Sequence, residues 1–236
     1  MAKTADNHAM LITGARKGIG KYLAEYYLGR GFRVVGCSRR APESSPPGYR
    51  HFCLDIADES AVKEMIRAIS QDYGGLKVLI NNAGIAAMNA ALLTPLSTLT
   101  KLLSTNFTGT FLLCREAAKL MQQQNYGRIV NFTTVAVPLK LEGEAIYAAT
   151  KAAVEMLTRI LARELATFGI TVNAIGPTPV QTDMIRALSP EKLQDLISRQ
   201  AIRRFGQFRD ISNVIDFFIS KDSDFITGQV IYLGGL

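Results

Sequence analysis

The chain has 236 residues, of which 48% are apolar and 20% are charged. This composition excludes a disordered or fibrous protein, and the length suits one α/β domain with a sizeable core. No apolar run reaches the ~18 residues of a membrane span. The short polar segment Met1 to His8 does not resemble a secretory signal.

The formal net charge is +7, but the basic residues are scattered and form no arginine-rich block, so nucleic-acid binding is not indicated. Anionic substrates or a phosphorylated cofactor explain the charge as well. Cys37, Cys53 and Cys114 form no C-x-x-C pair, and only two histidines are present, so we expect no metal site. Buried free thiols favour a reducing compartment, and we expect a cytoplasmic protein.

A β-α-β unit with a glycine-rich first turn is predicted at the start of the chain. The strand Ala9 to Thr13 is followed by a loop with the spacing G-x-x-x-G-x-G, a helix over Tyr22 to Arg30 and a strand over Phe32 to Cys37. Glycines at such a turn let backbone N–H groups and the helix N-terminus approach a pyrophosphate. A loop that is glycine-rich only for turning remains the alternative. We therefore expect the loop residues Gly14, Arg16, Lys17, Gly18, Ile19 and Gly20 to bind a nucleotide.

The end of the second strand reads Cys37-Ser38-Arg39-Arg40. NAD-binding units usually carry an acidic residue here for the ribose hydroxyls, and this chain has none. Arg39 could instead bind a 2′-phosphate, with Lys17 on its other side, because a guanidinium matches phosphate oxygens in a fork geometry. We expect NADP(H), held in part by Ser38, Arg39 and Arg40. A solvated basic loop is the alternative.

The rest of the chain continues the alternation of strands and helices. A strand over His51 to Leu54 ends at Asp55, which could meet the adenine edge, and Asp58 is expected to cap the next helix. The further predicted elements are a helix over Ala61 to Tyr73, a strand over Lys77 to Ile80 leading into Asn81-Asn82-Ala83-Gly84, a long helix over Leu99 to Gln124, a strand over Gly127 to Phe132, a helix from Tyr147 to about Phe168, a strand over Ile170 to Ile175, one or two mobile helices over Met184 to Arg204, a helix over Ile211 to Ser220 and a strand over Gln229 to Leu233. This order predicts an α/β fold with a single domain over residues 1–236: a Rossmann-type, doubly wound parallel sheet of about seven strands with helices on both faces. We expect a helical segment at about 182–206 to cover the substrate.

Tyr147 and Lys151 stand four residues apart on a predicted helix, and so on one face of it. A nearby lysine charge favours the phenolate and lowers the tyrosine pKa from about 10, so the pair could move a proton to or from a carbonyl oxygen. The same spacing occurs at Tyr73 and Lys77, where Gly74 and Gly75 are expected to end a helix. An ordinary amphipathic helix with a snorkelling lysine is therefore the alternative.

Together these residues resemble the short-chain dehydrogenase/reductase family, over nearly the whole chain and in the expected order. The matching segments are Thr13-Gly14-x-x-x-Gly18-Ile19-Gly20, Asn81-Asn82-Ala83-Gly84, Asn106, Tyr147-x-x-x-Lys151 and the loop from Pro177 to Thr182. Thr182-Asp183-Met184, Arg203-Arg204-Phe205-Gly206 and Phe225-Ile226-Thr227-Gly228-Gln229 are most like the 3-oxoacyl-ACP reductase branch.

The resemblance implies an NADPH-dependent carbonyl reductase in which Tyr147 is the general acid, Lys151 holds the nicotinamide ribose, and Asn106 anchors a water chain. It also implies a cofactor site that extends beyond the glycine loop and the Ser38 segment to Asp55, Asn82, Ala83, Gly84, Tyr147, Lys151, Pro177, Val180 and Thr182. Two positions depart from the family pattern. Thr134 stands where serine is usual, and Thr178 follows Pro177 where glycine is usual.

The substrate is expected to be a small keto or hydroxy compound, and the family is commonly a homotetramer or a homodimer. Acyl carrier protein is possible as a carrier but is not favoured, because Asn125 and Phe168 stand where the reductase branch commonly has basic residues. Arg128, Arg186, Arg199, Arg203 and Arg204 could compensate. A nucleotide-binding relative with little or no turnover remains the alternative from another functional class.

Overall fold

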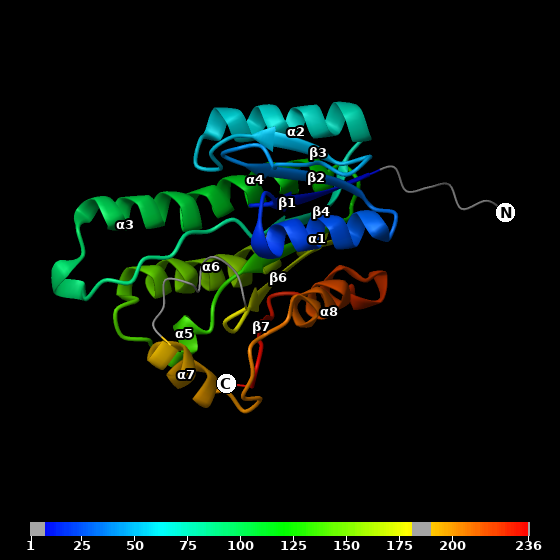
Figure 1. Ribbon diagram of the computed structural model, residues 1–236. Helices are drawn as coiled ribbons and strands as arrows, with labels where there is room; N and C mark the ends of the chain where they lie inside the picture. The colour runs from blue at the N-terminus through cyan, green and yellow to red at the C-terminus, as the bar shows by residue number, and fades with distance from the viewer. Residues whose placement is uncertain (1–7, 181–189, 236) are drawn as a thin grey trace.

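The computed structural model describes residues 8–180 and 190–235, and in this part of the chain seven strands form one sheet in the order β3-β2-β1-β4-β5-β6-β7 (Figure 1). Every pair of neighbouring strands is parallel. The strands are β1 (Ala9–Thr13), β2 (Arg33–Ser38), β3 (Arg50–Cys53), β4 (Leu76–Asn81), β5 (Gly127–Phe132), β6 (Ile170–Gly176) and β7 (Val230–Tyr232). The predicted fold class is confirmed.

Helices cover both faces of the sheet, as predicted for a doubly wound fold (Figure 1). The α-helices are α1 (Gly18–Gly29), α2 (Glu59–Tyr73), α3 (Leu96–Leu102), α4 (Gly109–Gln122), α5 (Ala136–Leu139), α6 (Ala145–Glu164), α7 (Pro190–Ser198) and α8 (Phe208–Ile219). Helices α2, α4 and α6 pack on one face, and α1 and α8 lie side by side on the other. Thr182, and the start of the helical region expected from Met184, lie outside the described residues.

Alternation along the strands divides the core into two layers. Leu11 and Leu79 point to the α2, α4 and α6 side, whereas Met10 and Ile80 point to the α1 and α8 side. All four side chains are fully buried, and each such burial stabilises the fold by about 1.5–3 kcal/mol. Strands that are buried on both faces explain why the sequence shows short apolar runs rather than alternating polarity.

Several predicted boundaries are wrong. Helix α1 begins at Gly18, directly after Lys17, whose backbone is extended, and not at Tyr22. The prediction started too late because glycine has a low helix propensity, so propensity alone disfavours a helix that begins at Gly18. Helix α6 ends at Glu164, and a separate 3-10 turn over Ala166–Phe168 follows it. The short helix α5 was not expected.

The helix predicted over Leu99 to Gln124 is interrupted. It starts earlier, at Leu96 directly after Pro95, and its middle section Leu103–Thr108 has π-helical hydrogen bonding between α3 and α4. Such π segments often mark functional sites. This one carries Asn106, whose side chain is fully buried.

The carboxyl ends of β1, β4, β5 and β6 meet at one edge of the sheet. From β1 the sheet continues through β2 in one direction and through β4 in the other, so the order reverses beside Thr13 and Asn81. Crevices at such reversals are the usual ligand sites of open α/β sheets.

Candidate active site

A cavity of about 780 Å³ lies at this reversal, and we call it the glycine-loop cavity. Its walls contain most of the residues predicted to bind a cofactor: Gly14, Arg16, Lys17, Gly18, Ile19, Ser38, Arg39, Arg40, Asp55, Asn82, Ala83 and Gly84. Leu54, Ile56, Ile85, Ala86 and Thr105 complete its lining. Gly20 is not part of the lining; it is buried at the base of the loop.

The glycines of the loop are required by its geometry. Gly14 has φ +68°, and a Cβ there would lie 2.9 Å from the Ala83 Cα. A Cβ on Gly20 would collide with the Gly14 carbonyl oxygen. The loop is fixed to β4 because Asn82 Nδ2 donates to the Thr13 carbonyl (2.8 Å) and the Ala83 N–H donates to Thr13 Oγ1 (2.9 Å).

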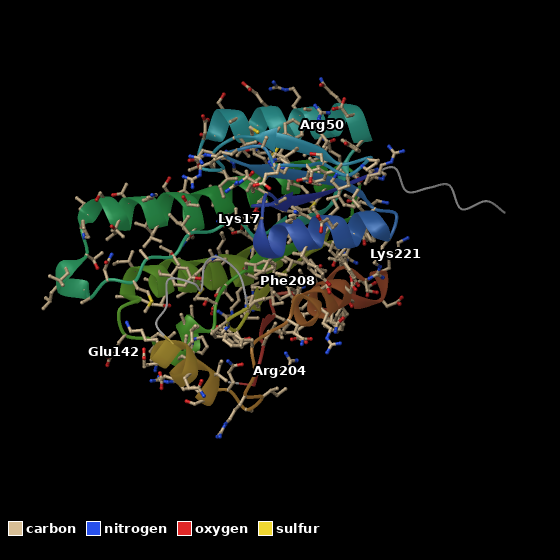
Figure 2. The ribbon with its side chains drawn as sticks, viewed as in Figure 1. Lys17, Arg50, Glu142, Arg204, Phe208 and Lys221 are labelled. Carbon is tan, nitrogen blue, oxygen red and sulfur yellow. The ribbon has the colours of Figure 1, made fainter. Side chains whose placement is uncertain are left out.

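The same loop leads into α1, whose N-terminal end Figure 2 marks with Lys17. No side chain caps this end among the described residues, so its first N–H groups can meet an anion. A close backbone approach beside a helix N-terminus fits the pyrophosphate of a dinucleotide.

The far end of the cavity is basic. Arg39 and Arg40 are exposed, and among the described residues neither has a carboxylate partner within 4 Å. Their charge is therefore available to an anionic ligand such as a 2′-phosphate.

Three polar side chains form a hydrogen-bonded chain that ends at this basic segment. Ser38 Oγ donates its only proton to the Arg40 carbonyl (2.7 Å), so it must accept from His51 Nε2 (2.8 Å). His51 Nδ1 then accepts from the Tyr49 hydroxyl (2.7 Å). Burial lowers the pKa of His51, which favours the neutral ring that this direction requires. A Cβ on Gly36 would collide with the Tyr49 hydroxyl, so the arrangement also depends on that glycine.

A second cavity of about 610 Å³, which we call the tyrosine cavity, adjoins the first. The two share Ile19, Asn82, Gly84 and Ala86 in their walls. The tyrosine cavity contains the predicted residues Thr134, Tyr147, Lys151, Pro177 and Val180. A ligand in the glycine-loop cavity can therefore reach the phenol and the ammonium group.

Lys151 lines the tyrosine cavity, whereas Asn106 lines neither cavity, and both lie close to Gly84 of the shared wall. Lys151 Nζ donates to the Phe132 carbonyl (2.8 Å) at the end of β5. Asn106 binds the Ile85 backbone twice, at 2.9 Å in each case, and its Nδ2 also donates to Thr150 Oγ1 (3.1 Å) on α6. A Cβ on Gly84 would lie 3.4 Å from both Asn106 Oδ1 and Lys151 Nζ. Asn106 thus holds the Gly84 turn and α6 together without lining either cavity.

The expectation that Lys151 lowers the pKa of Tyr147 is wrong for the ligand-free chain. Burial raises the pKa of the phenol to about 12, and the hydrogen bond with Thr134 opposes this rise. Burial of the phenol is the main cause, and Lys151 does not offset it: its ammonium group donates to the Phe132 carbonyl, and burial lowers the pKa of that group to about 8. Tyr147 is therefore a protonated phenol in this state, which suits a proton donor.

Thr134 and Thr178, which depart from the family pattern, are both buried. Thr134 Oγ1 accepts from the Ala136 N–H (3.2 Å) at the start of α5, and its hydroxyl also shares a hydrogen bond with the Tyr147 hydroxyl. Thr178 fits because glycines surround it: a Cβ on Gly206 would lie 2.9 Å from Thr178 Oγ1, and one on Gly234 would lie 2.8 Å from Thr178 Cγ2.

Two further residues line the tyrosine cavity. Glu144 lies three residues before Tyr147, and Leu196 of α7 belongs to the segment that was expected to cover the substrate. Sequence reasoning gave neither residue a role of its own. The link from Tyr49 through His51 to Ser38 depends on two neighbouring strands, and no spacing in the sequence marks it.

The described residues hold no group of three histidine, cysteine, aspartate or glutamate side chains suited to a metal ion. None of the helices that the structure describes combines the length and the apolar composition needed to cross a membrane.

Comparisons with known proteins agree with this geometry. A family model described as enoyl-(acyl carrier protein) reductase matches residues 14–235. The 3-oxoacyl-[acyl-carrier-protein] reductase FabG of Staphylococcus aureus is 36% identical over 95% of this chain and 96% of its own length. Among solved structures, ElxO with bound NADP has a TM-score of 0.88 at 30% identity, covering 96% of each chain. A short chain dehydrogenase/reductase family protein has a TM-score of 0.87 at 29% identity, covering 99% of this chain and 98% of its own.

Proposed function

Because the chain belongs to the short-chain dehydrogenase/reductase family of oxidoreductases, we propose that it is an NADPH-dependent reductase of ketones. The observation that carries the proposal is the junction of the two cavities, where a cofactor seated on the glycine loop meets Tyr147, Thr134 and Lys151. When bound, NADPH would supply the hydride, and the protein would supply orientation and a proton.

Arg39 and Arg40, which have no carboxylate partner within 4 Å among the described residues, support NADPH over NADH together with Lys17 of the same cavity. A 2′-phosphate would gain charge-assisted hydrogen bonds here, whereas a ribose hydroxyl would find no carboxylate among the residues of β2's end. Ser38 and His51 would keep this segment in place, so the preference depends on positioning as well as on charge.

The proton would come from Tyr147. Its phenol keeps its proton at neutral pH because burial raises its pKa to about 12, and it lines the cavity where a carbonyl can enter. As negative charge develops on the carbonyl oxygen, Thr134 would donate a hydrogen bond and Tyr147 a proton. Lys151 would hold the nicotinamide ribose and add positive charge beside the phenol.

The segment over about 182–206 would cover the substrate, which Leu196 of α7 supports by closing one wall of the tyrosine cavity. Residues 182–189 of that segment lie outside the described part of the chain. We also expect a homotetramer or a homodimer, since the family is commonly oligomeric.

The likeness to FabG favours a second candidate, reduction of 3-oxoacyl groups on acyl carrier protein. We do not favour the carrier, because the acidic carrier needs basic residues at the site mouth. Of the arginines that could compensate, Arg128 is buried, Arg199 is paired with Asp195 (2.9 Å) and Arg204 with Asp210 (2.7 Å), so that Arg203, which is exposed, is the one left to contact a carrier among those described. Arg186 lies outside the described residues.

The test of the function is NADPH oxidation with a panel of small ketones, and then with an acetoacetyl group presented on carrier protein and on its short thioester mimic. We expect turnover of small ketones and similar kcat/KM for the two acetoacetyl forms. An increase of about 100-fold on carrier protein, roughly 2.7 kcal/mol of transition-state binding, would establish the second candidate instead. Cofactor binding without turnover of any ketone would leave only a nucleotide-binding relative.

A further inference from the structure

Glu144 is the acidic side chain in the lining of the tyrosine cavity. It lies directly before α6, three residues from Tyr147, and only 9% of it is exposed. Glutamate is almost never buried to this extent unless it has a partner. We therefore expect a hydrogen-bond partner of this carboxyl group, either in the fold or in a ligand.

The part of the fold that the structure describes supplies no hydrogen-bond partner for this side chain. Glu144 occupies the N-cap position of α6, where its carbonyl accepts the Ala148 N–H (2.7 Å), yet its side chain makes no capping hydrogen bond. Among the described residues, no donor lies within hydrogen-bonding distance of its carboxyl group. Burial raises the pKa of Glu144, and the positive charge of Lys192 on α7 opposes this with a smaller effect.

The surroundings disfavour an apolar ligand at this carboxyl group. Leu141, Ala136 and Leu196 give the cavity apolar walls. The carboxyl oxygens are not among the fully buried, unpaired side-chain atoms of the described residues, so water or a ligand in the cavity can reach them. An apolar acyl chain in the cavity would exclude that water and donate no hydrogen bond, so it would leave the carboxyl group buried and unpaired, which is unfavourable. A ligand with a suitable donor would avoid this cost.

We propose that the substrate is a ketone that carries a hydroxyl group or a protonated amine, and that Glu144 binds this donor. The inference rests on the proposed function and deepens it. Side chains three residues apart around a helical turn have Cβ atoms about 5–6 Å apart, so the donor stands about one turn from the carbonyl that Tyr147 meets. Tyr147 donates a proton to the carbonyl oxygen, and Glu144 binds the hydroxyl group or protonated amine on the same substrate.

The experiment compares three ketones with the same ring: cyclohexanone, 4-hydroxycyclohexanone and 4-(dimethylamino)cyclohexanone. We expect kcat/KM to be at least about tenfold higher for one or both donor-bearing ketones, because a hydrogen bond to a charged group contributes about 1.5–3 kcal/mol. Selection of the hydroxyl ketone identifies a neutral donor, and selection of the amine identifies a cation.

Three variants assign the preference to the buried carboxyl. In Glu144→Leu the ratio of kcat/KM between donor-bearing ketone and cyclohexanone should fall to about one. Glu144→Gln should keep a preference for the hydroxyl ketone and lose one for the amine, because an amide accepts a hydrogen bond but carries no charge. Glu142→Leu is the matched control: Glu142 lies in the same loop, is exposed, and points away from the body of the protein (Figure 2), so its ratio should not change.

A binding series keeps the inference separate from the proposed function. Calorimetry on the complex with NADPH, which cannot oxidise an alcohol, would compare cyclohexanol, cyclohexane-1,4-diol and 4-(dimethylamino)cyclohexanol. We expect at least one donor-bearing alcohol to bind about tenfold more tightly, and Glu144→Leu to remove the difference. If no ketone is reduced, the proposed function fails, yet this series still tests Glu144. Equal affinities, or a preference that survives in Glu144→Leu, would overturn the inference.

Discussion

The glycine-loop cavity and the tyrosine cavity share a wall but are built differently. The first is made mostly of backbone: glycines with positive φ, a helix N-terminus, and arginines that reach in from one strand end. The second is made of side chains from β5, α5, α6, α7 and the loop after β6. A site built from backbone needs glycines at fixed spacings, and such spacings can be recognised in a sequence. A site built from side chains of several separate elements has no such pattern. The first cavity therefore indicates the cofactor, and the second decides the substrate.

The largest expected effect separates the two cavities. Tyr147→Phe keeps the ring and removes the proton, so turnover should fall by at least the ~10²-fold typical of a lost general acid. Binding of NADPH should remain, because the glycine loop and Arg39 are untouched. Steady-state kinetics and an NADPH titration on the same preparation check both parts, and near-normal turnover would remove Tyr147 from the mechanism.

Arg39→Asp should act on the glycine-loop cavity alone. The preference for NADPH over NADH should fall by about 10- to 100-fold, because a charged hydrogen bond contributes about 1.5–3 kcal/mol. The ratio of kcat/KM values between different ketones should stay the same. Arg33→Asp, at the opposite end of β2 and also exposed, is the control for the loss of one surface charge. Equal affinity of the unmodified protein for both cofactors would contradict the assignment.

Thr134 tests the tyrosine cavity without touching the acid. Thr134→Ser keeps the hydroxyl and should retain activity, whereas Thr134→Val keeps the shape and should lower kcat by about tenfold, roughly one hydrogen bond. The methyl group narrows the pocket, so the serine variant should also accept a wider range of ketones. Full activity in the valine variant would show that the hydroxyl is dispensable.

The smallest expected effect is a change of kcat/KM for NADPH with pH, caused by the ionisation of Lys151. Burial lowers the pKa of this ammonium group to about 8, so the charge is present below that pH and is lost as the pH rises through it. Because kcat/KM for NADPH reports the free enzyme, it should decrease above about pH 8. Tyr147 stays protonated over this range, with its pKa at about 12. In Lys151→Arg the side chain stays charged, and the decrease should disappear even if overall activity is lower.

The sequence was sufficient for the parts of the molecule that local patterns control. The β-α-β unit, the parallel sheet of about seven strands and the clustering of Gly14, Asn82 and Gly84 follow from runs and spacings that any parallel sheet imposes. The N-cap at Asp58 was also predicted, and its carboxylate accepts the Ala61 N–H (3.1 Å).

What could not be predicted depends on contacts between distant segments. The π-helical interruption around Asn106 is tied to partners at Ile85 and Thr150, and helix propensity carries no information about them. His51 on β3 reaches Ser38 on β2, and Glu144 enters the site because it shares the tyrosine cavity with residues of α5 and α7. The pKa of Tyr147 was predicted in the wrong direction because burial of the phenol, which the spacing of residues does not reveal, raises it, while the Lys151 ammonium group donates to the Phe132 carbonyl.

The central claim is that a hydride crosses from a cofactor in the glycine-loop cavity to a carbonyl in the tyrosine cavity. The most direct test uses NADPH labelled with deuterium at the transferable C4 position, with a ketone that the enzyme reduces, in ordinary water. We expect the label at the carbinol carbon of the product alcohol, and no carbon-bound deuterium there when unlabelled NADPH is used in D₂O. Loss of NADPH without label in the alcohol, or label at that carbon from the solvent, would contradict the account.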